Sequence, residues 1–139
     1  MNNKVIIITG GSSGIGKALA EQYGQLGGHI VITGRNKEKL QETTEELKKS
    51  GISIEGIPCD SSQEEETRLM IKKVIDQFGK IDLLINNAGI SMRSMFEEVH
   101  LDVLKKVMDI NFWGTVYTTH AALPYLKQSK GGIIEIGRA

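Results

Sequence analysis

Short runs of β-branched apolar residues alternate along the chain with longer stretches in which apolar residues recur every three or four positions. The short runs predict buried strands, at residues 5–8, 30–33, 52–58, 81–85 and 133–136. The longer stretches predict helices, at residues 14–26, 37–50, 62–78 and 101–128. Because strand and helix alternate and the connections are short, we expect a parallel sheet with helices on both faces.

Several residues mark where the helices begin and end. Glycines follow three of the predicted helices and are typical of helix C-termini, at Gly27, Gly51 and Gly79. Ser62 with Glu65 three residues later predicts a capping box. Pro124 lies inside the last predicted helix, where we expect a kink or a partial break.

Composition excludes several classes of protein. Lysine plus arginine balance aspartate plus glutamate at 17 each, so no net charge attracts nucleic acid or anionic lipid, and we expect neither as a partner. The single cysteine, Cys59, cannot form an internal disulfide, and the N-terminus lacks a signal-peptide pattern. No apolar run approaches the roughly 18 residues of a membrane span. These features predict a cytoplasmic protein without a membrane partner.

The connection between the first strand and the first helix is rich in glycine, reading Thr-Gly-Gly-Ser-Ser-Gly-Ile-Gly over residues 9–16. Backbone N–H groups and the positive end of the helix meet there, so a pyrophosphate can bind. Gly10 permits a tight turn, Gly14 lets the backbone approach the ligand, and Gly16 lets the helix pack closely. The alternative is an ordinary glycine-rich turn. We expect a dinucleotide to contact Gly10, Ser12, Ser13, Gly14, Ile15 and Gly16.

The residue after the second strand distinguishes the two nicotinamide cofactors, because an acid there binds the ribose 2′-hydroxyl and repels a 2′-phosphate. This chain has Gly34 at that position, followed by Arg35 and Asn36. A guanidinium pairs bidentately with a phosphate, and an asparagine amide donates a further hydrogen bond. We therefore expect NADP(H) rather than NAD(H). The alternative is a solvated arginine at the start of a charged helix.

Three motifs together point to a family. The glycine spacing is Gly-x-x-x-Gly-x-Gly, Asn86-Asn87-Ala88-Gly89 ends the fourth strand, and Asp109-Ile110-Asn111 lies in the long helix. In these motifs the chain resembles the short-chain dehydrogenase/reductase family, over its whole length. The resemblance implies a Rossmann-like, doubly wound α/β fold with a five-stranded parallel sheet in the order 3-2-1-4-5. It also implies one dinucleotide-binding domain over residues 1–139, truncated after the fifth strand and incomplete at its C-terminus.

The family resemblance also implies roles for individual residues. Asn87, Ala88 and Gly89 are expected beside the ribose and nicotinamide of the cofactor, and Asp60 near its adenine. For Asp60, a simple turn residue is the alternative. Asn111 corresponds to a catalytic asparagine that holds a water in a proton relay, although a polar residue satisfied within a helix is again the alternative. The implied activity is hydride transfer between a nicotinamide and a small carbonyl or alcohol substrate.

The remaining catalytic residues of the family are absent. Its tyrosine precedes a lysine by four positions, but the tyrosines here are followed at that distance by other residues, Tyr23 by Gly27, Tyr117 by Ala121 and Tyr125 by Ser129. Gly137-Arg138 stands where the family has a pair of serines, one of them catalytic. We therefore expect this chain alone to be inactive, as a truncated chain, the product of an interrupted gene or a minimal fold.

The sequence leaves two other functions open. The chain could be a module that senses NADP(H) without chemistry, or a non-catalytic interaction protein. The second reading depends on surfaces that truncation exposes, since the fifth strand becomes an edge and the long helix loses a neighbour. We accordingly expect a homo-oligomer formed through the long helix or the exposed edge strand. The three histidines are too far apart in sequence to predict a metal site, and the substrate is not specified.

Overall fold

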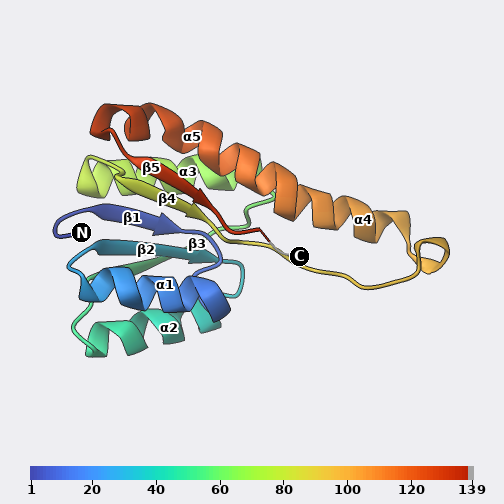
Figure 1. Ribbon diagram of the computed structural model, residues 1–139, viewed down its shortest axis with the longest axis horizontal. Helices are drawn as coiled ribbons and strands as arrows, with labels where there is room; N and C mark the ends of the chain where they lie inside the picture. The colour runs from blue at the N-terminus through green and yellow to red at the C-terminus, as the bar shows by residue number, and fades with distance from the viewer. Residues whose placement is uncertain (138–139) are drawn as a thin grey trace.

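The computed structural model describes residues 1–137, so Arg138 of the Gly137-Arg138 pair lies outside the described residues. Its centre is a parallel sheet of five strands in the order β3-β2-β1-β4-β5, which confirms the predicted fold (Figure 1). The chain runs from β1 outward to β3, crosses back to form β4 on the other side of β1, and continues outward to β5. The strands are β1 (Val5–Ile8), β2 (His29–Gly34), β3 (Ile54–Pro58), β4 (Leu83–Asn86) and β5 (Gly132–Glu135).

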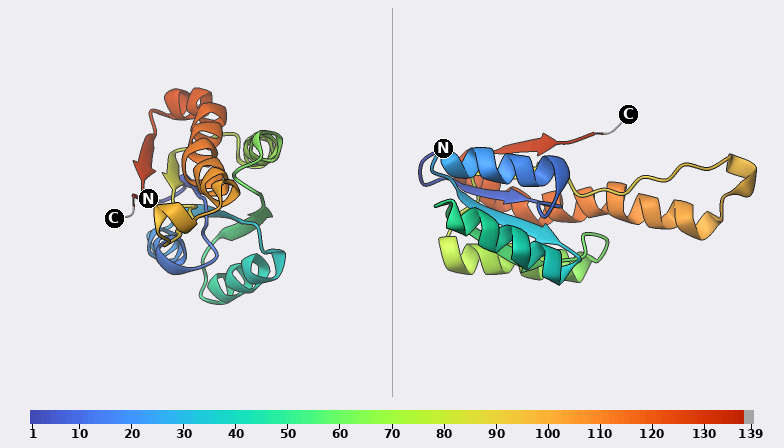
Figure 2. Two further views of the ribbon diagram at one scale, coloured as in Figure 1. Left: turned by 90° about the vertical axis from the view of Figure 1, so that its right-hand side faces the viewer. Right: turned by 90° about the horizontal axis from the view of Figure 1, so that it is seen from below.

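Helices cover both faces of the sheet, as expected for parallel strands that are apolar on both sides (Figures 1 and 2). The first two lie on one face, and the third and fifth lie on the other. The fourth helix and the loop before it extend beyond the sheet (Figure 2). The helices are α1 (Gly14–Gln25), α2 (Lys37–Lys49), α3 (Glu64–Phe78), α4 (Leu101–Met108) and α5 (Gly114–Ser129), with a short 3₁₀ turn at Phe96–Glu98 and a π-helical segment at Asp109–Trp113.

The core consists of two apolar layers separated by the sheet. Alternate β1 residues serve each layer, because successive side chains of a strand point to opposite faces. Ile6 and Ile8 pack with α1 and α2, whereas Val5 and Ile7 pack with α3 and α5. All four β1 residues are buried. The central strand is therefore a rigid base for the loop that follows it.

The capping box predicted at Ser62 is wrong. Helix α3 begins at Glu64, its N-cap residue is Gln63, and no side chain caps it. The Ser62 hydroxyl instead donates to Asp60 Oδ1 at 2.7 Å, and the Ser62 N–H donates to the same oxygen at 3.0 Å. Asp60 competes successfully for Ser62 because an aspartate readily accepts hydrogen bonds from the residue two positions later.

Of the kink or partial break expected at Pro124, the break does not occur, since α5 continues from Gly114 to Ser129 with Pro124 inside it. The change in helical hydrogen bonding occurs earlier, in the π-helical segment Asp109–Trp113 that joins α4 to α5. Such wide turns often occur at functional sites. The single helix predicted for residues 101–128 is thus two helices joined by a segment that contains Asn111.

Two predicted surfaces are partly exposed. Strand β5 pairs with β4 alone among the described residues, and Ile133 is 39% exposed. Its neighbours Ile134 and Ile136 are half-buried against the layer of Ile6 and Ile8. On the long helices, Met108 is 52% exposed and Val116 37%. Within residues 1–137 no helix is both long and apolar enough to span a membrane.

Candidate cofactor site

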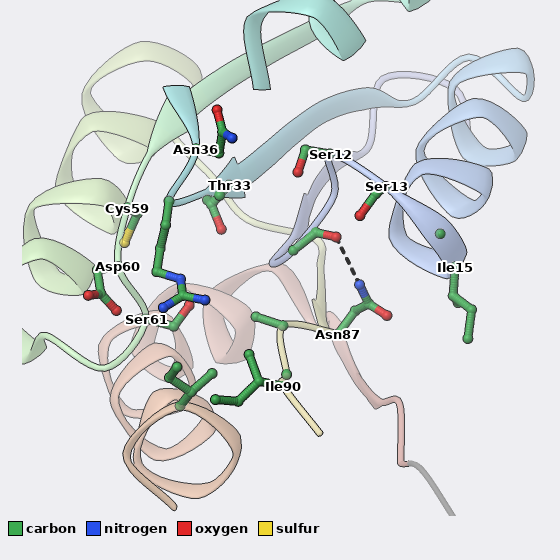
Figure 3. A pocket seen from close by; sticks show the side chains of 17 residues that line it. Ser12, Ser13, Ile15, Thr33, Asn36, Cys59, Asp60, Ser61, Asn87 and Ile90 are labelled. Atoms are coloured by element: carbon green, nitrogen blue, oxygen red, sulfur yellow. Dashed lines mark hydrogen bonds between the residues drawn. The ribbon is translucent and has the colours of Figure 1, made fainter. Parts of the chain in front are cut away.

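The carboxyl ends of four strands surround a cavity of about 630 Å³ (Figure 3). Parallel α/β sheets bind ligands at this edge, where the strand order reverses, and the volume is in the usual range for a ligand site. The cavity brings together residues that are widely spaced in the sequence. Those that line it are Gly10, Ser12, Ser13, Gly14, Ile15, Thr33, Gly34, Arg35, Asn36, Cys59, Asp60, Ser61, Asn87, Ala88, Gly89, Ile90 and Ile110.

The glycine-rich turn after β1 has the conformation that its glycines predict. Gly10 and Gly14 have φ values of +65° and +55°, which disfavour any other residue. A Cβ at Gly14 would meet nothing within 4 Å, so the backbone there faces open space. A Cβ at Gly16 would lie 2.4 Å from Gly10 O, so α1 packs against the turn as closely as expected.

The other residues of this turn present backbone and side chains to the same cavity. Ser13 is the N-cap residue of α1, but its side chain makes no capping hydrogen bond. Ile15 is 51% exposed although it belongs to the apolar pattern of α1. Because Ile15 lines the cavity, its exposure is on the side where a ligand can bind. Gly16 lies behind the turn and does not line the cavity.

A buried threonine connects this turn to the loop after β4. Thr9 Oγ1 accepts the backbone N–H groups of Asn87 and Ala88, each at 3.0 Å. In return Asn87 Nδ2 donates to Gly10 O at 3.0 Å (Figure 3) and to Thr9 O at 3.1 Å. Sequence reasoning missed Thr9. The available signal was a threonine that directly follows a fully apolar strand, at the sheet edge where ligands bind.

The end of β2 supplies the only basic side chain among the residues that line the cavity, Arg35. A Cβ at Gly34 would lie 3.3 Å from Ser12 Oγ, a tight contact, so glycine at this position lets the end of β2 lie close to the glycine-rich turn. Asn36 caps α2, because its Oδ1 accepts the Lys39 N–H at 3.1 Å. That bond uses the oxygen of the Asn36 amide, and the NH₂ group is the part that can donate to an anion.

The end of β3 contributes Cys59, Asp60 and Ser61. Asp60 does form the turn that was its alternative role, through its two bonds to Ser62, and it also lines the cavity. Cys59 is buried, and this burial raises the pKa of its thiol to about 11. A thiol with so high a pKa is inert at neutral pH, so Cys59 is a packing residue.

Both ends of the Asn111 side-chain amide bond to the loop after β4. Its Oδ1 accepts the Ile90 N–H at 2.8 Å and its Nδ2 donates to Ile90 O at 2.7 Å. This pair of bonds holds the loop that begins with Asn87, Ala88 and Gly89 against the π-helical segment. Asn111 lies in a second cavity of about 520 Å³, which adjoins the first through Ala88, Gly89 and Ile90.

Charge in the site is simple. Within the described part of the chain, no group of three or more His, Cys, Asp or Glu side chains is arranged to hold a metal ion. The cavity presents the guanidinium of Arg35, the carboxylate of Asp60, several hydroxyl groups and the N-terminal end of α1. The guanidinium and the helix end are suited to phosphate groups. A parallel sheet with such an edge defines a dinucleotide-binding class of α/β protein.

Comparison with known proteins identifies the family. The chain matches the short chain dehydrogenase family over residues 4–138, and it belongs to that family. It is 44% identical over 133 residues to 11-beta-hydroxysteroid dehydrogenase 1A of Arabidopsis thaliana, a match that covers 94% of this chain and 38% of that protein. It is also 42% identical over 133 residues to 11-beta-hydroxysteroid dehydrogenase A of Sesamum indicum, and this match covers 94% of this chain and 38% of that protein.

A solved structure agrees in fold. An actinorhodin polyketide ketoreductase crystallised with NADPH superimposes with a TM-score of 0.91 at 28% identity. The match covers 96% of this chain and 52% of the ketoreductase. The chain thus spans less than half the length of the two plant dehydrogenases and about half of the ketoreductase.

Proposed function

We propose that this chain is the NADP(H)-binding portion of a short-chain oxidoreductase. The observation that carries the proposal is the cavity where the glycine-rich turn, Arg35 and the loop after β4 meet. The residues fit such a cofactor, because Gly14 faces open space where a pyrophosphate would approach the start of α1. The NADPH in the structure of the similar ketoreductase supports the same assignment.

The parts of the cofactor would be held by different elements. Gly10, Ser12, Ser13, Gly14 and Ile15 would hold the pyrophosphate, with Gly16 packed behind them. Asp60 would lie near the adenine, whereas Asn87, Ala88 and Gly89 would lie beside the ribose and nicotinamide. The Thr9 bonds to Asn87 and Ala88 would fix the distance between the part of the site that holds the pyrophosphate and the part that lies beside the nicotinamide.

The preference for NADP(H) over NAD(H) rests on β2. An acidic residue at its end would repel a 2′-phosphate, and this chain has Gly34 there with Arg35 next to it. A charge-assisted bond between a guanidinium and a phosphate contributes about 1.5–3 kcal/mol. We therefore expect NADPH to bind about ten times more tightly than NADH, or better.

In the whole enzyme, the bound cofactor would supply the hydride for a small carbonyl compound or accept it from an alcohol. The contribution of this chain would be to position the nicotinamide through Gly89 and to hold Ile90 through Asn111. Because both ends of the Asn111 amide bind Ile90, its first role is positioning, and a water in the proton relay would bind beside it. The second cavity, next to the nicotinamide end, would hold part of the substrate.

We propose that these 139 residues by themselves carry out no turnover. None of their three tyrosines precedes a lysine by four positions, so the usual proton donor is missing. General acid–base catalysis commonly contributes about 10²- to 10⁴-fold, which Asn111 alone cannot replace.

Calorimetric titration combined with an assay of NADPH oxidation tests this proposal. We expect binding of NADPH, weaker binding of NADH, and no oxidation of NADPH with a panel of ketones and aldehydes. Steady NADPH oxidation that disappears in Gly14→Asp would show that the chain is itself an enzyme. Absence of any NADPH binding would overturn the proposed function.

A second candidate, an interaction module, is favoured by the exposed apolar side chains of α4, α5 and β5. Met108, Val116 and Ile133 are all more than one-third exposed, and exposed apolar surface of this kind favours association. We propose a second copy of this chain as the partner, through the long helices or through the edge of β5. Size-exclusion chromatography with light scattering tests it, and a monomer at all concentrations would contradict it.

A further inference from the structure

Helix α2 buries two neighbouring threonines, Thr43 and Thr44, which are 4% and 8% exposed. The Thr44 hydroxyl donates to the Leu40 carbonyl one turn earlier in the same helix, at 2.7 Å. The Thr43 hydroxyl is directed out of the helix and donates to the backbone carbonyl of Ser12 at 2.8 Å, across 31 positions of the sequence. Thr43 thus joins α2 to the glycine-rich turn after β1.

The bond from Thr43 determines which way one peptide group of the turn faces. Ser12 and Ser13 line the cofactor cavity, whereas Thr43 is buried and does not line it. The Ser12 carbonyl oxygen therefore faces α2 and not the cavity. In a planar trans peptide the C=O and the N–H that follows it point in opposite directions, so the Ser13 N–H is directed away from α2, to the side on which the cavity lies.

The Ser13 N–H lies at the start of α1, where donors are free to bind a ligand. The first N–H groups of a helix have no acceptor within it, and the Ser13 side chain makes no capping hydrogen bond. Gly14, the next residue, faces open space at the cavity. Backbone N–H groups at a helix start bind phosphate oxygens, whereas a carbonyl oxygen turned the same way repels them. The orientation of the peptide between Ser12 and Ser13 therefore affects phosphate binding.

The turn needs such a support because its glycines leave its backbone free to move. Gly10, Gly11 and Gly14 have no side chain to restrict φ and ψ. The Gly11 N–H donates to Thr33 O at 3.1 Å and ties the first part of the turn to β2. The Thr43 bond acts further along, on the peptide just before α1 begins.

We propose that Thr43 is a positioning residue for the pyrophosphate of the cofactor, because its hydroxyl holds the Ser12–Ser13 peptide with the N–H toward the phosphates. This inference rests on the proposed function and adds to it a residue on α2, outside the cavity. A turn already held in its binding conformation loses less entropy when the ligand binds. NADPH and NADH share the pyrophosphate, so Thr43 serves both, whereas Arg35 distinguishes them.

The test compares Thr43→Val with Thr44→Val as a matched control. Each variant removes one buried hydroxyl from α2 and keeps the shape of the side chain, but only Thr43 is bonded to the turn. Thermal melts measure the ligand-free proteins, and calorimetry measures their affinities for NADPH and NADH. We expect both variants to lower the Tm by about 2–6 °C, from the loss of one hydrogen bond each.

The two variants should differ in binding. Thr43→Val should weaken NADPH and NADH by the same factor, about 3- to 10-fold, and Thr44→Val should bind both within about 2-fold of wild type. Thr43→Ser keeps the hydroxyl and should restore both affinities to within about 2-fold of wild type. If either valine variant fails to fold, Thr43→Ala and Thr44→Ala make the same comparison.

Several results would overturn the inference. Wild-type affinity in Thr43→Val, or an equal loss in Thr43→Val and Thr44→Val, would show that the bond to Ser12 has a structural role alone. A loss confined to NADPH would show that the effect is not on the pyrophosphate. A loss in Thr43→Ser as large as in Thr43→Val would show that the hydroxyl is not responsible. If the wild-type chain binds neither dinucleotide, the proposed function itself fails, and the inference fails with it.

Discussion

Thr9 Oγ1 accepts the backbone N–H of Asn87 at 3.0 Å, across 78 positions of the sequence. The same oxygen accepts the Ala88 N–H, so one hydroxyl holds the start of the loop after β4 beside the glycine-rich turn after β1. Both loops line the proposed cofactor cavity. The geometry of the site therefore depends on a side chain that is itself buried and does not line the cavity.

Replacement of Thr9 by valine should destabilise the protein by about 2–5 kcal/mol, because it leaves two buried N–H groups without their acceptor. Thr9→Ser keeps the oxygen and is the matched control, for which we expect a loss of about 1 kcal/mol or less. Urea denaturation measures both. Equal stability of the valine and serine variants would show that the hydroxyl does not hold the two loops together.

Arg35→Asp should weaken NADPH binding by at least about 10-fold, through loss of a charge-assisted bond and added repulsion of the 2′-phosphate. NADH has no such phosphate and should be much less affected. Arg93→Asp makes the same charge change at an exposed position outside the cavity, and it should leave both affinities unchanged. A similar loss for NADPH and NADH in calorimetric titrations of Arg35→Asp would rule out a contact with the 2′-phosphate.

Asn111→Ala removes both hydrogen bonds that hold Ile90. We expect hydrogen exchange at the Ile90 amide to accelerate by about 10-fold or more, since the local structure opens more readily. Thr115→Ala removes a neighbouring bond to the Asn111 carbonyl and serves as the control, with Ile90 exchange unchanged. If exchange at the Ile90 amide is the same in wild type, Asn111→Ala and Thr115→Ala, the two Asn111 hydrogen bonds do not hold this loop in solution.

Asp82 links the start of β1 to β4 and makes stability depend on pH. Burial tends to raise the pKa of this carboxyl, but the Val5 N–H, which donates to it at 2.8 Å, and the ammonium groups of Lys80 and Lys4 outweigh burial and lower the pKa. The folded state thus holds this proton less tightly than the unfolded state. The stabilisation is present above the unfolded pKa of about 3.9 and is lost as pH falls through the lower folded value.

The corresponding variant, Asp82→Asn, should be less stable than wild type by about 1 kcal/mol or more at pH 7, and the difference should shrink below about pH 4. Asp76→Asn removes an exposed carboxylate that pairs with Lys72 and should change stability little at any pH. Thermal melts from pH 7 to pH 3 measure both. A difference between Asp82→Asn and wild type that stays constant across this range would contradict the account.

The sequence predicts the sheet well, because its information there is redundant. The four residues of β1 are apolar, the turn after them contains glycines at positions with positive φ, and Gly27 and Gly79 follow helices as expected. A one-residue shift of an element boundary changes little of this pattern. The family resemblance implied the strand order, and the meeting of the four loops at one edge follows from that order. Neither required knowledge of side-chain contacts.

The structural features that the sequence did not predict depend on two kinds of contact. Some join residues that are distant along the chain, and others arise where neighbouring residues compete for the same hydrogen-bond partner. Thr9 and its partner Asn87 are linked only after β1 and β4 pair. Ser62 fits a capping pattern, but Asp60 is a closer acceptor. Helix α5 is continuous through Pro124. The π-helical segment Asp109–Trp113 contains no proline, so the sequence gives no signal of a change in helical hydrogen bonding there.

Two glycines allow the most direct test of the claim that this chain binds NADP(H) at the edge beside the glycine-rich turn. Gly14 and Gly51 both have positive φ, +55° and +82°, and a Cβ at either would meet nothing within 4 Å. Aspartate at either position therefore brings similar backbone strain. Only Gly14 lines the cavity, so only there would the new carboxylate face the pyrophosphate.

The deciding measurement is calorimetric titration of NADPH into the wild-type chain, Gly14→Asp and Gly51→Asp. We predict one NADPH site per chain in wild type, an affinity within about 2-fold of wild type in Gly51→Asp, and a loss of about 10-fold or more in Gly14→Asp, from repulsion between the carboxylate and the phosphates. No binding by the wild-type chain, or equal affinities in Gly14→Asp and Gly51→Asp, would contradict the assignment of this edge as the cofactor site.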